Sequence, residues 1–303
     1  MLNAVLFSAL RRGRGFTLPA VKNAGYHPWH ISSDDAILPQ ETHADEAQIL
    51  TKSMRDRFHS AFYREIDTLF LDVGGTLVSI DYEWVCEELS RFGVRCTLEQ
   101  LQRAEAAARP IVSNKLAGLQ PGASEQAGTF EFYLQTTLEH VPDETVEVRK
   151  TLPAIAEKLA PILRQPGRSD RLWSRVIPGA RDALTGFAAM GLTIVAVSNS
   201  DGTVERLLHD CGLRSFFHAV VDSHVIGYAK PDPRIFEHAL ALSGAAADRI
   251  LHVGDMYYAD IVGAEAAGIH AVLLDPFDDW TDVECIRFRD LPALYKEIAR
   301  ARL

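Results

Sequence analysis

Polar residues that could do chemistry together follow three short apolar runs of the sequence. An aspartate at the end of a buried strand is unusual enough to need a reason, because a lone charge is costly to bury. Asp72 follows the run LFL, and Asp255 follows the run ILHVG. Ser198 and Asn199 follow the run TIVAV. Two further residues complete the set: Lys230 in the loop GYAKPDP, and Asp260 five positions after Asp255.

Taken singly, these residues have structural explanations, since Ser198 and Asp255 could cap helices and Lys230 could be a solvated lysine. Taken together, they bring carboxylates, a hydroxyl, an amide and an ammonium group to one crevice. Buried carboxylates repel one another and raise each other's pKa. A divalent cation, Lys230 and a bound anion would compensate one another, so the set indicates a functional site.

The elements that position these residues follow from two alternating hydrophobic patterns. Strand-like apolar runs lie at residues 68–73, 192–199, 218–223, 250–255 and 270–275, and helix-period segments lie at 179–191, 201–212, 232–244 and 258–268. Continuous apolar strands separated by helices are typical of a parallel sheet covered on both faces. We therefore expect an α/β fold, a Rossmann-like three-layer sandwich with right-handed connections, whose strand ends meet at one edge.

Residues 79–174 interrupt this alternation. They contain no convincing strand and predict about four helices, at residues 81–93, 97–118, 124–140 and 143–165. We expect a Rossmann-like core at residues 64–78 and 175–303, and an inserted helical cap domain at 79–174.

The position of this insertion, directly after Asp72, favours a lid over the strand ends. Its aromatic residues are expected in its own hydrophobic core rather than in contact with substrate: Trp84, Phe130, Phe132 and Tyr133. No single arginine or histidine of the insertion stands out as a substrate contact.

The first 63 residues predict an N-terminal extension with one helix, within residues 45–65. Residues 1–33 contain several basic residues and no acidic one, a pattern that partly resembles an organelle transit peptide. A poorly ordered extension, or a start codon placed too early, is the favoured interpretation.

Composition limits the classes of partner and compartment. Hydrophobic residues make up 47% of the 303-residue chain and charged residues 24%, as in ordinary soluble proteins. The net charge of −10 argues against nucleic acid and anionic membranes as partners. No apolar run approaches transmembrane length, and no two of the four cysteines form a close pair. These features favour a cytoplasmic protein, with organelle targeting as the alternative, and leave the oligomeric state open.

From about residue 66 the chain resembles the haloacid dehalogenase-like (HAD) hydrolase superfamily, and the insertion resembles that superfamily's first (C1) class of cap. The first family motif, Asp-x-Asp-x-Thr after a strand, is matched by Asp72-Val73-Gly74-Gly75-Thr76. The strand-end Ser or Thr is matched by Ser198, and the Lys before Pro by Lys230. The fourth motif, Gly-Asp followed by a second Asp, is matched by Asp255 and Asp260.

The resemblance implies a role for each of these residues. Asp72 is the carboxylate nucleophile, which forms an aspartyl-phosphate or aspartyl-ester intermediate. Asp72, the backbone carbonyl of Gly74 and Asp255 hold Mg²⁺, and Asp260 supports the metal shell.

Further roles concern the phosphate and the turn. Backbone N–H groups near Gly74 and Gly75, together with Ser198, hold the transferring oxygens, and Thr76 orients the turn. Lys230 neutralises the intermediate and positions the nucleophile. Asn199 is grouped with Ser198 among the catalytic residues.

Gly74 departs from the family pattern. In the family's phosphatases the second Asp of the first motif protonates the leaving group and then activates water, and a glycine does neither. Three explanations are open: a phosphatase for leaving groups that need little protonation or that borrows an acid, a 2-haloacid dehalogenase-like hydrolase, and a weakly active or non-catalytic binding protein. Asp255 and Asp260 would be poorly tolerated beside Asp72 without a cation, which favours Mg²⁺-dependent phosphatase chemistry on a small phosphorylated substrate.

We predict that residues 1–44 are dispensable, because they lack apolar periodicity and differ in charge from the rest. A protein that begins near Asp45 should stay soluble, with an unchanged unfolding midpoint and unchanged turnover. Thermal unfolding and activity assays check this, and a midpoint lowered by several degrees would show instead that the extension packs on the core.

Overall fold

The computed structural model describes residues 61–117, 127–142, 146–165 and 169–303. The segment 1–44, and most of the expected extension at 1–63, lie outside these ranges. Residues 61–65 are helical, and Tyr63 is buried in the hydrophobic core with 1% exposure. The core therefore begins before residue 64, where the sequence analysis placed its boundary.

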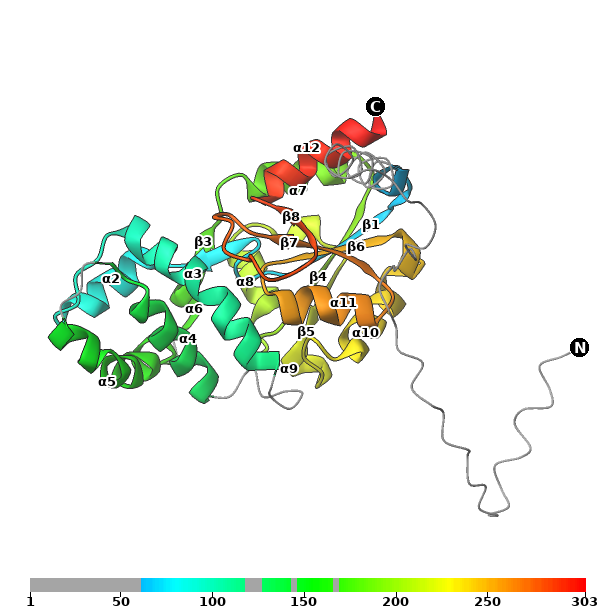
Figure 1. Ribbon diagram of the computed structural model, residues 1–303. Coiled ribbons are helices and arrows are strands. Elements are labelled where there is room, and N and C mark those ends of the chain that lie inside the picture. Colours follow the sequence, from blue (N-terminus) through cyan, green and yellow to red (C-terminus); the bar gives the residue numbers. More distant parts are fainter. Residues whose placement is uncertain (1–60, 118–126, 143–145, 166–168) are drawn as a thin grey trace, which may run out of the picture. The chain divides into compact units, whose positions relative to one another are not determined.

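A six-stranded parallel sheet forms the centre of the fold (Figure 1). Its spatial order is β5-β4-β1-β6-β7-β8. The strands are β1 (Thr68–Leu71), β4 (Thr193–Ser198), β5 (Ala219–Asp222), β6 (Ile250–Gly254), β7 (His270–Leu274) and β8 (Ile286–Phe288). The predicted α/β architecture is confirmed, with five of its strands at the expected places. The edge strand β8 was not expected, because three half-exposed residues carry no continuous apolar run.

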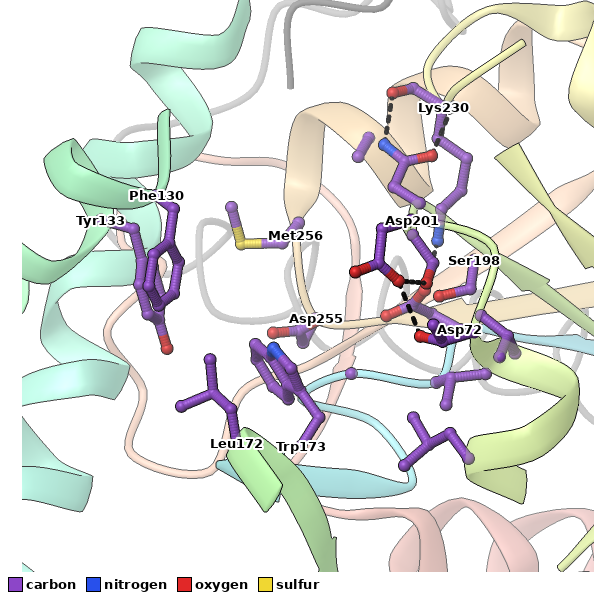
Figure 2. A pocket seen from close by; sticks show the side chains of 18 of the residues that line it. Asp72, Phe130, Tyr133, Leu172, Trp173, Ser198, Asp201, Lys230, Asp255 and Met256 are labelled. Atoms are coloured by element: carbon purple, nitrogen blue, oxygen red, sulfur yellow. Dashed lines mark hydrogen bonds and ion pairs between the residues drawn. The ribbon is translucent and has the colours of Figure 1, made fainter. Parts of the chain in front are cut away.

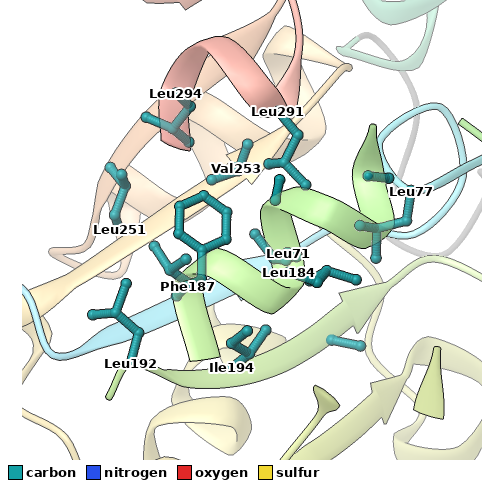
Figure 3. Packing of buried hydrophobic residues seen from close by; sticks show 14 of the residues in the cluster. Leu71, Leu77, Leu184, Phe187, Leu192, Ile194, Leu251, Val253, Leu291 and Leu294 are labelled. Carbon is teal, nitrogen blue, oxygen red and sulfur yellow. The ribbon is translucent and has the colours of Figure 1, made fainter. Parts of the chain in front are cut away.

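Both faces of the sheet are buried because neighbouring strand residues point to opposite sides. Leu69 and Leu71 join one hydrophobic cluster, and Phe70 joins the other. The first cluster is covered by α7 (Ala180–Ala189) and α12 (Leu291–Arg302), as Figure 3 shows around Phe187. The second is covered by α10 (Pro233–Ser243), by a π-helical segment (Tyr257–Val262) and by α11 (Gly263–Ala266). The single helix predicted at 258–268 is thus divided in two.

Short helices complete the connections of the sheet. They are α8 (Val204–Asp210), α9 (Ser223–Ile226) and two 3-10 turns at Arg214–Phe216 and Ala247–Arg249. None of the helices in the described part of the chain combines the length and apolarity needed to cross a bilayer.

A helical insertion, residues 81–172, leaves the sheet after β1 and returns before α7. Its helices are α2 (Tyr82–Ser90), α3 (Leu98–Ala117), α4 (Ala127–Glu139), α5 (Val146–Leu163) and α6 (Ser169–Leu172). They enclose a hydrophobic cluster of their own, which includes Leu101, Leu138 and Leu159. The insertion therefore has the packing of an independent helical unit.

Two short strands connect the insertion to the sheet. β2 (Val78–Ile80) and β3 (Trp173–Val176) pair antiparallel. The expectation that residues 79–174 contain no strand is corrected here, since strands of three and four residues are too short to show a period in sequence.

Two cysteines of the insertion are neighbours in space. The sulfur atoms of Cys86 and Cys96 lie 3.3 Å apart, although ten positions separate the residues. The absence of a close cysteine pair, inferred from sequence spacing, is thus wrong for these two thiols.

Candidate active site

Three of the predicted site residues converge because of the order of the strands. β1 lies between β4 and β6, so Asp72, Ser198 and Asp255 follow three adjacent strands at one edge of the sheet. All three side chains are buried, and all three line one cavity of about 390 Å³. Figure 2 shows them facing this cavity together with Lys230. The prediction that these strand ends form one crevice is confirmed.

Aspartates also end the outer strands β5 and β7, but they serve the backbone. Asp222 accepts hydrogen bonds from the N–H groups of Gly202, Val204 and His224. Asp275 accepts hydrogen bonds from the backbone of Asp279 and Trp280. A strand-end aspartate therefore belongs to the site only where its strand lies beside β1.

Lys230 links two of the carboxylates. Its Nζ lies 2.6 Å from Asp72 Oδ1 and 2.6 Å from Asp260 Oδ1. The loop that carries it is held by Asn199, whose amide donates to the carbonyl of Lys230 and accepts from its N–H, at 2.9 and 2.7 Å. Asn199 therefore positions Lys230 and also lines the cavity, and its expected place among the catalytic residues stays a prediction.

His252 is a member of the site that sequence analysis missed. Its Nε2 lies 3.0 Å from Asp260 Oδ1, and its ring is fully buried on β6 against Phe236. Asp260 also accepts a hydrogen bond from the N–H of Met256. The only sequence signal was a histidine inside the apolar run ILHVG.

Arg109, on α3 of the helical insertion, is the second missed residue. Its Nη1 lies 3.3 Å from Asp255 Oδ2, and its other nitrogens donate to Glu105 at 2.7 to 3.1 Å. The hydroxyls of Tyr82 and Tyr133 also donate to Glu105. Arg109 is thus a partner of Asp255, and whether any arginine of the insertion contacts substrate stays a prediction. The contacts of Arg109 arise only when α3 packs against the loop after β6, which sequence spacing does not reveal.

Burial and charge together set the protonation of the aspartates. Burial, opposed by Lys230, raises the pKa of Asp72 to about 6. Burial, opposed by Arg109, also holds the pKa of Asp255 well above its ordinary value. Burial alone would raise the pKa of Asp260, but Lys230 and His252 together lower it. Asp260 and Asp72 in turn raise the pKa of Lys230 against the effect of burial, so this ammonium group stays charged.

The three aspartates form a suitable cation site. Oxygen atoms of Asp72, Asp255 and Asp260 lie within 4.8 Å of one another, and all three residues are buried. Carboxylate oxygens are hard ligands, which suit Mg²⁺ better than softer metals. The donor set and the raised pKa values of two members both fit a divalent cation.

Glycines let the backbone approach these carboxylates closely. Gly75 has a φ of +74°, and a Cβ there would collide with the carboxylate of Asp255. A Cβ at Gly254 would collide with the carboxylate of Asp260. Thr76 is buried, and its hydroxyl has no hydrogen-bond partner among the described residues. Its expected role in orienting the turn stays a prediction.

Gly74 faces an aromatic ring instead of open space. A Cβ built at Gly74 would lie 3.3, 3.5 and 3.6 Å from three carbons of the Trp173 indole. The place where a longer side chain would extend is therefore filled by Trp173, which sits on β3. Sequence analysis identified the missing side chain but not the residue that replaces it.

Some aromatic residues of the insertion lie in its hydrophobic cluster, and others also line the cavity. Trp84 lies in the hydrophobic cluster of the insertion with 3% exposure, as expected. Phe130 and Tyr133 pack against that cluster but also line the cavity, which corrects the expectation for these two. In Figure 2 they lie across the cavity from Asp72, and Trp173 lies nearer to Asp72 than they do.

The sequence of this chain is similar to those of known proteins. A family model described as haloacid dehalogenase-like hydrolase matches residues 66–268. Haloacid dehalogenase-like hydrolase domain-containing protein 3 of Bos taurus is 39% identical over 129 residues, which cover 41% of this chain and 51% of that protein. Phosphoserine phosphatase of Thermus thermophilus is 33% identical over 138 residues, 45% of this chain and 54% of that protein. The aligned part thus spans about half the length of these relatives.

A solved structure supports the fold. The HAD-hydrolase YfnB from Bacillus subtilis, crystallised with magnesium, matches 77% of this chain and 99% of its own with a TM-score of 0.52. The two sequences are 18% identical, so the likeness concerns the fold alone.

We predict that Asp72→Asn stabilises the protein when metal is removed by chelation. The pKa of Asp72 is about 6 in the fold against an ordinary 3.8, so ionising it costs folding free energy as pH rises through this interval. Asparagine carries no charge at any pH. The variant should therefore gain on the order of 1–3 kcal/mol at pH 8 and progressively less as pH falls to 4. Urea unfolding in EDTA measures this.

The control for this experiment is Asp278→Asn, because the side chain of Asp278 is 88% exposed. It should change the unfolding free energy little at either pH. A gain in Asp72→Asn that is equal at pH 8 and pH 4 would contradict the pKa assigned to Asp72.

Proposed function

This chain belongs to the haloacid dehalogenase-like hydrolase family, and on that premise we propose that it is a Mg²⁺-dependent phosphatase of small phosphorylated substrates, acting through an aspartyl-phosphate on Asp72. The observation that carries the proposal is the cluster of three buried aspartates around Lys230. Such a cluster is unfavourable without a cation, whereas displacement of a halide requires none. The phosphoserine phosphatase among its relatives supports the same choice.

The nucleophilic step belongs to Asp72. One of its carboxylate oxygens attacks phosphorus, the bond from phosphorus to the leaving oxygen breaks, and that oxygen keeps the electron pair. Water then attacks the phosphorus of the aspartyl-phosphate, which restores the carboxylate and releases inorganic phosphate. Lys230 holds one oxygen of Asp72 and so fixes the direction of attack.

Other groups of this chain bind the transferring phosphate. Ser198 and Gly74 line the cavity with Asp72, and the backbone N–H of Gly74 is the candidate donor of the turn. The N–H of Gly75 donates instead to the carbonyl of Val78 at 2.7 Å. Asp72, Asp255 and the carbonyl of Gly74 would hold Mg²⁺, with Asp260 supporting it. When bound, Mg²⁺ lowers the repulsion between a carboxylate and a phosphate dianion.

We predict that Asp255→Asn weakens Mg²⁺ binding and lowers turnover together, because it removes one charge from the cation site. The loss of turnover should be at least about tenfold, and titration calorimetry with MgCl₂ should show weaker binding in the absence of substrate. Asp201→Asn is the matched control for Mg²⁺ binding, since Asp201 lines the same cavity but lies outside the carboxylate cluster.

The assay uses acetyl phosphate as substrate, with MgCl₂ or with excess EDTA. Full activity in EDTA would remove the phosphatase proposal in this form and return attention to dehalogenase chemistry, which release of halide from 2-haloacids would test. A protein that binds neither Mg²⁺ nor phosphate analogues would have a non-catalytic role. Acid-stable labelling of the protein by acetyl [³²P]phosphate, lost in Asp72→Asn, reports the intermediate directly.

We predict that activated phosphates are hydrolysed far faster than alkyl phosphates, because Gly74 supplies no general acid. Such an acid is typically worth ~10²- to 10⁴-fold, so kcat/KM for acetyl phosphate should exceed that for glycerol phosphate by a ratio of this order. Equal rates, with chemistry limiting, would mean that another group donates the proton.

The same hypothesis predicts how an acid can be restored. Gly74→Asp alone should help little, because the indole of Trp173 fills the space. Gly74→Asp combined with Trp173→Ala should raise the rate on glycerol phosphate most and so narrow the ratio. Trp173→Ala alone is the control, and a ratio that narrows equally in this control would assign the effect to the loss of the ring.

A further inference from the structure

The face of Trp173 forms part of a mostly apolar cavity wall directly beside the nucleophile. Its ring lies 3.3 Å from the Cβ position of Gly74, two residues after Asp72. Trp173 is only half-buried, and it lines the cavity of about 390 Å³. Pairing of β3 with β2 fixes its backbone at this place. A leaving group attached to phosphate at Asp72 would therefore meet the indole where most phosphatases of this family present a carboxylate.

The wall around Trp173 is also apolar and partly aromatic. Residues that share this wall are Val112, Leu116, Phe130, Tyr133, Leu172 and Met256. The rings of Phe130 and Tyr133 are stacked, with centroids 6.0 Å apart and planes 19° from parallel. Figure 2 shows them on the side of the cavity opposite Lys230 and Ser198. The cavity thus has a charged end that suits phosphate and a mainly apolar end that suits its substituent, where Arg164 lies over the ring of Phe130 and Glu105 accepts from Tyr133.

Two further carboxylates that line the cavity, Glu105 and Asp201, accept hydrogen bonds from neighbouring side chains. Glu105 accepts from Arg109, Tyr82 and Tyr133. Asp201 accepts from the hydroxyl of Thr203. Gly74 has no side chain, so no acid stands at the motif position that would face the leaving group.

The apolar, aromatic wall around Trp173 and the lack of an acid at Gly74 favour the same kind of leaving group. A phenol has a pKa of about 10, so its anion leaves readily, whereas an aliphatic alcohol is roughly as weak an acid as water. Aromatic rings also pack favourably on other aromatic rings. Resting on the phosphatase function proposed above, we propose that the substrate is an aryl phosphate, a phosphate monoester of a phenol whose ring packs against Trp173.

The reaction balances without a protein acid. Asp72 attacks phosphorus, the bond between phosphorus and the phenolic oxygen breaks, and phenolate departs with the electron pair and takes its proton from water. Hydrolysis of the aspartyl-phosphate then gives inorganic phosphate. A nucleotide also offers a flat ring that could pack on this wall. Breaking its phosphate ester, however, releases a sugar alkoxide, which is a poor leaving group without a general acid.

Binding without turnover is the first test. Calorimetry with the Mg²⁺-loaded protein compares phenylphosphonate with methylphosphonate, which differ only in the ring. We expect phenylphosphonate to bind at least about tenfold more tightly in the wild type and in Trp173→Phe, and this preference to disappear in Trp173→Leu. Phe277→Leu, a substitution at an exposed phenylalanine that does not line the cavity, is the control and should keep the preference.

Turnover is the second test. We expect kcat/KM for phenyl phosphate to exceed that for uridine 5′-monophosphate and glycerol phosphate by ~10²-fold or more. Comparable rates on the nucleotide, equal binding of the two phosphonates, or a preference that survives Trp173→Leu would each overturn the proposal. Lack of Mg²⁺-dependent hydrolysis of acetyl phosphate is a different result: it overturns the phosphatase function, while the phosphonates still report on the ring subsite.

Discussion

The arrangement of the site depends on one constraint, the excess of negative charge that is buried at the edge of the sheet. Among the described residues, the printed ion pairs of Asp72, Asp255, Asp260 and Glu105 with lysine or arginine involve Lys230 and Arg109. Each cation lies between two carboxylates, so each carboxylate has a partner and none is fully neutralised. Lys230 lowers the pKa of Asp260, yet burial still raises the pKa of Asp72, which makes the nucleophile the least stabilised charge beside Lys230. The proposed divalent cation would supply the positive charge that Lys230 and Arg109 leave unmatched.

The charged residues of the site come from separate parts of the chain, and this decides which of them the sequence predicts. Asp72, Ser198 and Asp255 are readable because each ends an apolar run, and a parallel sheet brings such ends to one edge. Strand order is not readable, so Asp222 and Asp275 look equivalent to them until the sheet shows that their strands lie farther from β1. Arg109 and Trp173 belong to the helical insertion and its return strand, and their contacts with Asp255 and Gly74 come from packing between segments far apart in sequence. No local pattern encodes such contacts, which is why the missing side chain of Gly74 was visible and its replacement was not.

Three contacts along helix α3 connect the insertion to the part of the chain that carries the candidate site. Arg103 pairs with Asp279, Arg109 with Asp255, and the hydroxyl of Ser113 accepts from the N–H of Tyr258. Only the middle contact involves a proposed metal ligand, and it is also the most buried of the ion pairs, which makes it the one most sensitive to desolvation. The position of α3 and the charge state of Asp255 are therefore physically coupled, so a movement of this helix alters the cation site directly.

The paired strands β2 and β3 place the two ends of the insertion side by side. A segment whose ends are adjacent can be lengthened, shortened or exchanged at little cost to the domain that receives it, because its removal leaves a gap that a short turn closes. Asp72, Ser198, Lys230 and Asp255 all lie outside this segment, whereas Phe130 and Tyr133 lie within it and Trp173 stands at its boundary. The proposed chemistry and the proposed substrate preference can therefore evolve separately: exchange of the segment between β2 and β3 would keep the proposed phosphate-binding residues and give them a different cavity wall.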